Sequence, residues 1–278
     1  MTFKSKNVNL NKPIPVDEFI YRLLYNSKSG YYIKKNPFGS KGDFITSPII
    51  SNLFSEIIGI WITSAWEEIG KPKVFNVVEL GPGDGSLAKV LLDTFNKFPE
   101  LNNSLRFYLY EKSTLLKKHQ KKKLKNYEVK WLRNFKEITA GPVIFFGNEF
   151  FDAIPIKQFI VKNKTMYEKY LSVAQNFGIF ESFKEARKED INIIKSYKTL
   201  KNNNFVEYPK LGFNELNKIL EKISQLSGGI LLIDYGHLNL KNNNTLQAVV
   251  KNRKININNL HKYLGKADIT YLVNFTLL

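Results

Sequence analysis

One stretch, residues 74–98, constrains the fold of this chain more than any other. Residues 74–80 form an almost continuous apolar run rich in β-branched side chains, which is typical of a strand buried on both faces. From Leu87 to Phe98, apolar residues recur with the period of an amphipathic helix. Between the two segments lie three glycines at alternate positions: Gly81, Gly83 and Gly85. The stretch therefore predicts a strand, a glycine-rich turn and a helix whose N-terminus faces a ligand.

The spacing of these glycines narrows the class of ligand. Ser86 stands where the dinucleotide fingerprint G-x-G-x-x-G needs its third glycine, and no Lys-Ser or Lys-Thr pair follows to form a phosphate-binding P-loop. Glu79, at the end of the predicted strand, would repel a pyrophosphate but would attract an ammonium group. S-adenosylmethionine carries an ammonium group, a sulfonium group and no phosphate. The segment therefore resembles the cofactor loop of class I methyltransferases.

The composition is that of a globular protein that uses neither disulfides nor thiol chemistry. The 278 residues are 43% apolar and 14% aromatic, and there is no cysteine. No apolar run approaches the roughly 20 residues of a membrane span. The N-terminus lacks the apolar core of a secretory signal and the arginines of a transit peptide. We therefore expect a cytoplasmic, bacterial enzyme with no metal site, and the sequence sets no oligomeric state.

The formal net charge of +17 has two interpretations. It can indicate an acidic partner such as nucleic acid or an anionic membrane surface. It can also reflect a composition rich in lysine and asparagine, with lysines spread over solvated faces. The densest cluster, residues 117–125, has no aromatic residues interleaved to stack on bases, so a nucleic-acid partner is the less favoured alternative.

Further elements follow from periodicity and turn residues. The pattern predicts helices at about 15–30 and 50–69. In the second helix one side carries the apolar residues Leu53, Phe54, Ile57, Ile58, Trp61 and Ala65. Residues 159–170 alternate like a hairpin with its turn at 163–164. Other predicted strands are 105–110, 129–132, 143–146 and 230–233.

Acidic residues follow two of these predicted strands. In α/β nucleotide folds, an acid at the end of the second strand accepts both ribose hydroxyls, and Glu111 stands there. The alternative is a solvated acid at the start of a helix. Asn148, Glu149 and Asp152 follow the fourth strand, at the crevice edge of an open sheet, where they should face the methyl donor. The alternative for this segment is that its side chains only cap a turn.

Four segments together carry a resemblance to one family. They are, in chain order, residues 42–48, 79–83, 148–155 with Gln158 and Phe159, and 233–236. Together they resemble the MidA-like family of S-adenosylmethionine-dependent methyltransferases. The resemblance implies an α/β, class I methyltransferase (Rossmann-like) fold: a mostly parallel sheet with helices on both faces, an N-terminal helical extension and an inserted cap. Mitochondrial members are complex I assembly factors that methylate an arginine of a complex I subunit.

The resemblance also assigns sites and domains. It implies that Gly42, Thr46 and Ser47 help to enclose the cofactor and that residues 148–155 lie by the substrate. We expect an extension over 1–72 and a methyltransferase core over 73–278, with an insertion at about 160–210 that caps the crevice. Two carboxylates can orient a guanidinium, which stays protonated at neutral pH, and we expect Glu149 and Asp152 to do so while Asn148 positions the substrate or donor.

Three departures from the family pattern leave other functions open. Ile49 replaces an acid, Asp84 replaces an arginine of the glycine loop, and the chain ends at Leu278, where family members continue, so we expect a truncated form. The alternatives are a non-catalytic assembly or binding protein that retains the fold, and a nucleic-acid methyltransferase. His237, after the strand at 230–233, is either a base or, more in keeping with a lone histidine there, a structural residue.

Overall fold

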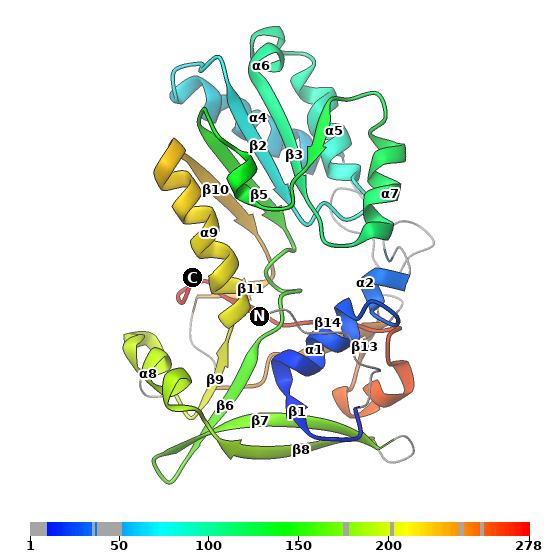
Figure 1. Cartoon of the computed structure of the whole chain (residues 1–278), viewed down its shortest axis with the longest axis vertical. Coiled ribbons are helices and arrows are strands. Elements are labelled where there is room, and N and C mark those ends of the chain that lie inside the picture. The colour runs from blue at the N-terminus through cyan, green and yellow to red at the C-terminus, as the bar shows by residue number, and fades with distance from the viewer. Residues whose placement is uncertain are drawn as a thin grey trace. The chain divides into compact units, whose positions relative to one another are not determined.

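The structure is a computed structural model that describes residues 10–34, 37, 52–174, 178–200, 203–238, 242–250 and 253–278. The predicted cofactor residues Gly42, Thr46 and Ser47, and also Ile49, lie outside the described residues. The chain forms two compact units (Figure 1). The parallel-sheet unit comprises Lys35–Phe150 and Glu215–Asp234, and the antiparallel-sheet unit comprises Met1–Lys34, Phe151–Asn214 and Tyr235–Leu278. The predicted domains, 1–72 and 73–278 with an insertion at about 160–210, stay a prediction.

The parallel-sheet unit is built on five strands in the order β10-β5-β2-β3-β4. Every neighbouring pair is parallel, and β2 is buried along its whole length, as the apolar run predicts. The strand order reverses at β2, which lies between β3 and β5. The strands are β2 (Phe75–Leu80), β3 (Leu105–Tyr110), β4 (Val129–Trp131), β5 (Val143–Asn148) and β10 (Gly228–Ile233).

Helices cover both faces of this sheet. Leu91 and Phe95 of α5 pack with Ile62 of α4 in one apolar cluster that includes strand residues of one face. Ile219 of α9 belongs to a second cluster, with Phe145 and other residues of the opposite face. These clusters confirm the predicted fold class. The helical elements are α4 (Asn52–Glu68), α5 (Ser86–Phe95), α6 (Pro99–Ser104), α7 (Thr114–Lys123), α9 (Lys210–Leu226) and the short η1 (Phe135–Glu137).

The buried side of α4 differs from the predicted one. Ile57 and Trp61 are 57% and 39% exposed, whereas Ile62 and Trp66 are buried. Apolar side chains surround most of this helix, so its hydrophobic period does not select one face. The contact with α5 does select one: a Cβ on Gly59 would lie only 3.1 Å from the Thr94 side chain, so the glycine lets the two helices approach closely. Ile58, on the same predicted side, is buried, so the apolar side predicted for this helix is buried only in part, and Gly59 marks the contact with α5.

The antiparallel-sheet unit contains the predicted hairpin. β6 (Lys157–Lys162) and β7 (Thr165–Ala174) pair antiparallel across Asn163 and Lys164, whose φ angles of 49° and 64° are those of a two-residue hairpin turn. The other elements are β1 (Ile14–Pro15), α1 (Val16–Tyr25), α2 (Tyr31–Lys34), β8 (Gly178–Glu185), α8 (Lys188–Ser196), η2 (Lys198–Leu200), β9 (Phe205–Tyr208), β11 (Gly236–His237), β12 (Gln247–Val250), β13 (Arg253–Ile255), η3 (Ile257–Tyr263), β14 (Asp268–Thr270) and β15 (Val273–Asn274).

Two searches of the described residues bear on the expected partners. Over these residues, no helix combines the length and the apolar character that crossing a membrane requires. In the same part of the chain, no cluster of three or more histidine, cysteine, aspartate or glutamate side chains is suited to hold a metal ion.

Gly228, the first residue of β10, allows the pairing of β10 with β5 to be tested. Gly228 has a φ of +126°, and a Cβ there would lie 1.9 Å from the carbonyl oxygen of Val143 on β5. We therefore expect Gly228→Ala to lower the free energy of unfolding by at least about 2 kcal/mol in urea denaturation. Gly229→Ala is the matched control, because its Cβ would meet only Ile144 at 3.8 Å. Equal stability of the two variants would contradict this pairing of β10 with β5.

Candidate functional site

The glycine loop between β2 and α5 has the backbone that its sequence predicts. Gly81 and Gly85 have φ angles of 62° and 81°, in the region that glycine favours. A Cβ at position 81 would lie 2.9 Å from the ring of Phe150, so a side chain does not fit there. Gly85 is the N-cap of α5. The loop therefore presents main-chain atoms, and the free N–H groups that begin a helix, at the carboxyl end of the central strand.

Asp84, the departure from the family pattern, is engaged within the loop. Its Oδ1 accepts a hydrogen bond from the Ser86 amide at 3.0 Å. Its Oδ2 accepts hydrogen bonds from the Ser86 hydroxyl at 3.0 Å and from Nζ of Lys123 at 2.6 Å. A carboxylate at a helix N-terminus is favourable, and Lys123 balances its charge. Asp84 thus holds the turn together and ties it to α7.

Glu79 is the exceptional group of this site. Its side chain lies at the end of β2 and the residue is only 2% exposed. Within the described part of the chain, its Oε2 atom makes no hydrogen bond. Burial, and after it the charges of Asp84 and Glu111, raises the pKa of Glu79 well above its usual range. Buried polar atoms are nearly always paired, so an unpaired carboxylate at this position indicates a site for a cationic ligand group.

Glu111, at the end of β3, is held beside the same loop. Its Oε1 accepts a hydrogen bond from the Ser113 amide at 2.7 Å, and its Oε2 accepts one from Nε2 of Gln120 at 3.2 Å. The same Gln120 nitrogen donates to the carbonyl oxygen of Gly83 at 2.8 Å. Burial raises the pKa of Glu111, and these hydrogen bonds act in the opposite direction. The structure therefore brings the two predicted acids, Glu79 and Glu111, to one loop.

Sequence analysis missed Gln120, although a signal was present. It is the one polar residue other than lysine or histidine in the lysine-rich run of α7 after Thr114, and it is completely buried. A polar side chain on the apolar face of a helix needs a hydrogen-bonding partner, and here that partner is the glycine loop. The prediction for this segment considered its lysines and did not include Gln120.

The site residues fit the cofactor that the sequence implies. Glu79 offers an unsatisfied carboxylate oxygen for an ammonium group, and Glu111 offers further lone pairs of a fixed carboxylate for hydroxyl groups. The loop from Gly81 to Gly85 offers main-chain atoms between them. The assignment of these residues to cofactor binding is a proposal that this donor set supports.

The segment after β5 places two of the three predicted catalytic residues together. Glu149 has a φ of 52°, which is unusual for a residue other than glycine, and its amide donates to the carbonyl oxygen of Ile233 on β10 at 2.8 Å. Nδ2 of Asn148 lies 3.4 Å from Oε1 of Glu149. Burial raises the pKa of Glu149, and the Asn148 hydrogen bond opposes that shift. Glu149 is thus a partly desolvated carboxylate in a strained turn at the carboxyl edge of the sheet.

Asp152, the third predicted catalytic residue, belongs to the antiparallel-sheet unit. It is 6% exposed. Its charge adds to the effects of burial, Asp268 and Tyr25 that hold the pKa of Tyr32 well above the usual tyrosine value. The hydroxyl of Tyr32 donates to Oδ1 of Asp268 at 2.9 Å. Asp152 therefore lies in an acidic, tyrosine-rich environment within its own unit, and its catalytic role stays a prediction.

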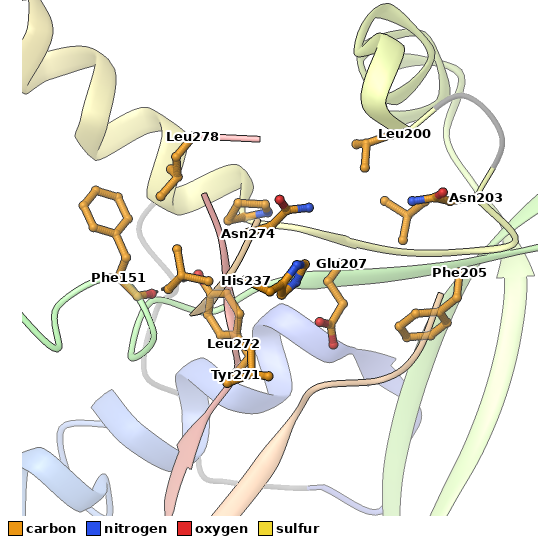
Figure 2. A pocket seen from close by; sticks show the side chains of 13 residues that line it. Phe151, Leu200, Asn203, Phe205, Glu207, His237, Tyr271, Leu272, Asn274 and Leu278 are labelled. Carbon is orange, nitrogen blue, oxygen red and sulfur yellow. Dashed lines mark hydrogen bonds between the residues drawn. The ribbon is translucent and has the colours of Figure 1, made fainter. Parts of the chain in front are cut away.

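His237 lines a small pocket of the antiparallel-sheet unit, together with Glu207 and Asn274 (Figure 2). Its Nδ1 atom is buried and makes no hydrogen bond within the described residues. Glu207 is held in place by the amide of Thr245 at 3.0 Å and by Nε2 of Gln158 at 2.8 Å. The cavity volume of about 20 Å³ is that of one water molecule. A structural histidine normally has both ring nitrogens satisfied, and the buried Nδ1 of His237 has no hydrogen bond within the described residues, so the role of His237 stays a prediction.

The burial of Glu79 has a consequence for stability that can be measured. Because its pKa is raised on folding, the folded, ligand-free protein holds this proton more tightly than the unfolded chain does. The free energy of unfolding therefore falls as the pH rises from the unfolded pKa, about 4.3, towards the raised folded value. We expect Glu79→Gln to increase stability near neutral pH and to flatten its pH dependence in urea titrations.

The control for this comparison is Glu128→Gln, which changes an exposed acid before β4 and should leave the pH dependence of stability unchanged. If Glu79→Gln were less stable than the natural protein at neutral pH, the carboxylate would have a partner and the account of its burial would be wrong.

Comparisons with known proteins identify the family and the fold of the chain. A family model described as "Putative S-adenosyl-L-methionine-dependent methyltransferase" matches residues 57–278. The protein named Protein arginine methyltransferase NDUFAF7 homolog, mitochondrial, from Drosophila melanogaster is 31% identical over 295 residues, which cover 96% of this chain and 66% of that protein. Its counterpart from Xenopus tropicalis is 29% identical over 307 residues, covering 100% and 69%. The chain thus spans about two thirds of the length of these relatives.

A crystal structure from Burkholderia thailandensis shares the fold. It superposes with a TM-score of 0.77 at 23% sequence identity, covers 95% of this chain and 70% of that one, and contains bound S-adenosyl-homocysteine. The fold class and the family that the four sequence segments predict are therefore confirmed. Since the family model matches most of its length, the chain belongs to the family of S-adenosyl-L-methionine-dependent methyltransferases.

Proposed function

We propose that this protein transfers the methyl group of S-adenosylmethionine to an arginine side chain of a protein substrate. The observation that carries the proposal is the buried carboxylate of Glu79 before the glycine loop, whose Oε2 atom makes no hydrogen bond within the described residues. The names of the relatives from Drosophila melanogaster and Xenopus tropicalis, both protein arginine methyltransferases, support the substrate class. A respiratory complex I subunit as substrate and a bacterial cytoplasmic location are finer parts of this proposal, and the sequence resemblance supports the first of them.

The proposed contacts with the cofactor follow from the carboxylates and main-chain groups at the glycine loop. Glu79 pairs with the ammonium group of the methionine moiety, which removes the cost of its buried charge. Glu111 accepts hydrogen bonds from the ribose hydroxyls. Gly81, Gly83 and Gly85 allow the main chain to approach the ligand. When bound, the cofactor supplies an electrophilic methyl group on a sulfonium centre.

Methylation of an arginine side chain is helped by a carboxylate that orients its guanidinium group. A guanidinium has no free lone pair until it loses a proton, and it presents planar donors that match a carboxylate. Glu149 is half-desolvated, so a cationic partner interacts with it more strongly than with an exposed acid. We assign to Glu149 the orientation of the guanidinium and the acceptance of its proton, with Asn148 fixing the carboxylate. Asp152 is the proposed second carboxylate.

The same geometry also suits a protein that binds the cofactor without catalysis, the alternative that the sequence left open. The two functions differ in whether a methyl group appears on a partner. Incubation of the protein with isotopically labelled donor and purified complex I subunits, followed by mass spectrometry, should give methylated arginine. Cofactor binding without any labelled product on these subunits would favour the binding function, and labelled nucleic acid would favour the second alternative.

A substitution of Glu149 separates its proposed role toward the substrate from a role in cofactor binding. Glu149→Gln should lower turnover by a factor of about 100, because it removes a charge that acts on the reacting group, while the affinity for the cofactor changes less than about threefold. Turnover is measured with labelled donor and affinity by calorimetry, with Glu128→Gln as the exposed control. Loss of cofactor binding in Glu149→Gln would show that this carboxylate belongs to the cofactor site instead.

A further inference from the structure

Gln120 connects three separate parts of the parallel-sheet unit. Its side chain projects from α7, is fully buried, and reaches the loop after β2, the acid after β3 and the strand β4. A Cβ on Gly85 would lie 3.4 Å from Cγ of Gln120, so the side chain also packs against the end of the loop. No other described side chain bonds to both Gly83 and Glu111. Gln120 is therefore the residue through which the two predicted cofactor elements are coupled.

The direction of the Gln120 amide is fixed by Trp131. The indole Nε1–H of Trp131 donates to Oε1 of Gln120 at 2.8 Å. Indole nitrogen only donates, so the amide oxygen must face Trp131 and the amide nitrogen must face Glu111 and Gly83. A flipped amide would place its oxygen against a carboxylate and a carbonyl, which repel it. The tryptophan thus selects one of two otherwise similar orientations.

The amide in turn fixes the carboxylate of Glu111. One oxygen is bound by the Ser113 amide and the other by Nε2 of Gln120. Both bonds favour the ionised form against the effect of burial. A backbone hydrogen bond from Lys112 acts in the same direction. A carboxylate has about four acceptor positions, so these three bonds leave capacity for one further donor. A carboxylate held in this way can meet a ribose hydroxyl group without first losing rotational freedom.

We propose that Gln120, oriented by Trp131, is a positioning residue for ribose recognition: it holds Glu111 and the glycine loop in the arrangement that receives the ribose hydroxyls of the cofactor. This inference rests on the proposed cofactor site, and it adds two residues to which neither the sequence pattern nor the named relatives assign a role. Gln120 acts through Glu111 and Gly83, and Trp131 acts through Gln120.

The test compares two ligands that differ in one hydroxyl group. Calorimetry gives the dissociation constants of S-adenosylhomocysteine and of its 2′-deoxy analogue. With the natural protein, loss of the hydroxyl should weaken binding by a factor of about 10, the value of a hydrogen bond to a charged group. In Gln120→Met, which keeps the length of the side chain but removes its polar atoms, the two ligands should bind within about twofold of each other.

Trp131→Phe is a second variant, and it allows the test to be made even if Gln120→Met does not fold. It keeps an aromatic ring in β4 but removes the indole donor, so the amide of Gln120 loses its orientation, and we expect an intermediate ratio between the two ligands. Lys118→Met, an exposed change on the same helix, should retain the ratio of the natural protein.

Two results would overturn the inference in distinguishable ways. If Gln120→Met and Trp131→Phe weaken both ligands by the same factor, so that the ratio stays near 10, these residues only support the fold. If the natural protein binds S-adenosylhomocysteine without any preference over the 2′-deoxy analogue, Glu111 does not read the ribose and there is nothing for Gln120 to position. If the natural protein does not bind either ligand, the proposed cofactor site fails, and the inference fails with it.

Discussion

The buried carboxylate of Glu79, whose Oε2 atom has no hydrogen bond within the described residues, is the feature on which the proposed site depends. Two carboxylates, Asp84 and Glu111, lie close enough to raise its pKa further, so the ligand-free site concentrates negative charge in a buried environment. Such an arrangement is unfavourable in itself and is kept only where a ligand compensates it. The strand, the glycine loop and α5 supply the position, because a parallel sheet brings its carboxyl ends to one edge.

Contacts of the neighbouring residues satisfy Asp84 and Glu111 and leave Glu79 available for a ligand group. Lys123 neutralises Asp84, and Gln120 and Ser113 satisfy Glu111, so of the three acids only Glu79 keeps a buried oxygen atom without a hydrogen bond in the described residues. The contacts of the three acids therefore differ: Asp84 is bonded within the turn, Glu111 is held by Ser113 and Gln120, and Glu79 keeps an oxygen atom for the cation that we propose. This division explains how Asp84 can replace the arginine of the family pattern without loss of the loop.

Local patterns predicted the frame of the site, and long-range contacts determined what the patterns did not. The apolar run of β2, the alternate glycines and the acid at the end of each strand are local features of the sequence, so the sequence alone locates Glu79, Gly81 and Glu111. The helical period of α7 marks Gln120 as a polar residue on an apolar face, but it does not identify the bonded residues, which lie 37 and 9 positions away in the chain. The buried face of α4 depends in the same way on its contact with α5 at Gly59.

The central claim is that Glu79 must lose a proton to receive the ammonium group of the cofactor. Titration calorimetry of S-adenosylhomocysteine at about pH 5.5 and about pH 7.5, each in two buffers of different ionisation enthalpy, tests this claim directly. We expect affinity to rise with pH and binding to release a proton wherever the pH lies below the raised pKa of Glu79. Affinity independent of pH with no proton release, or no binding at all, would contradict it.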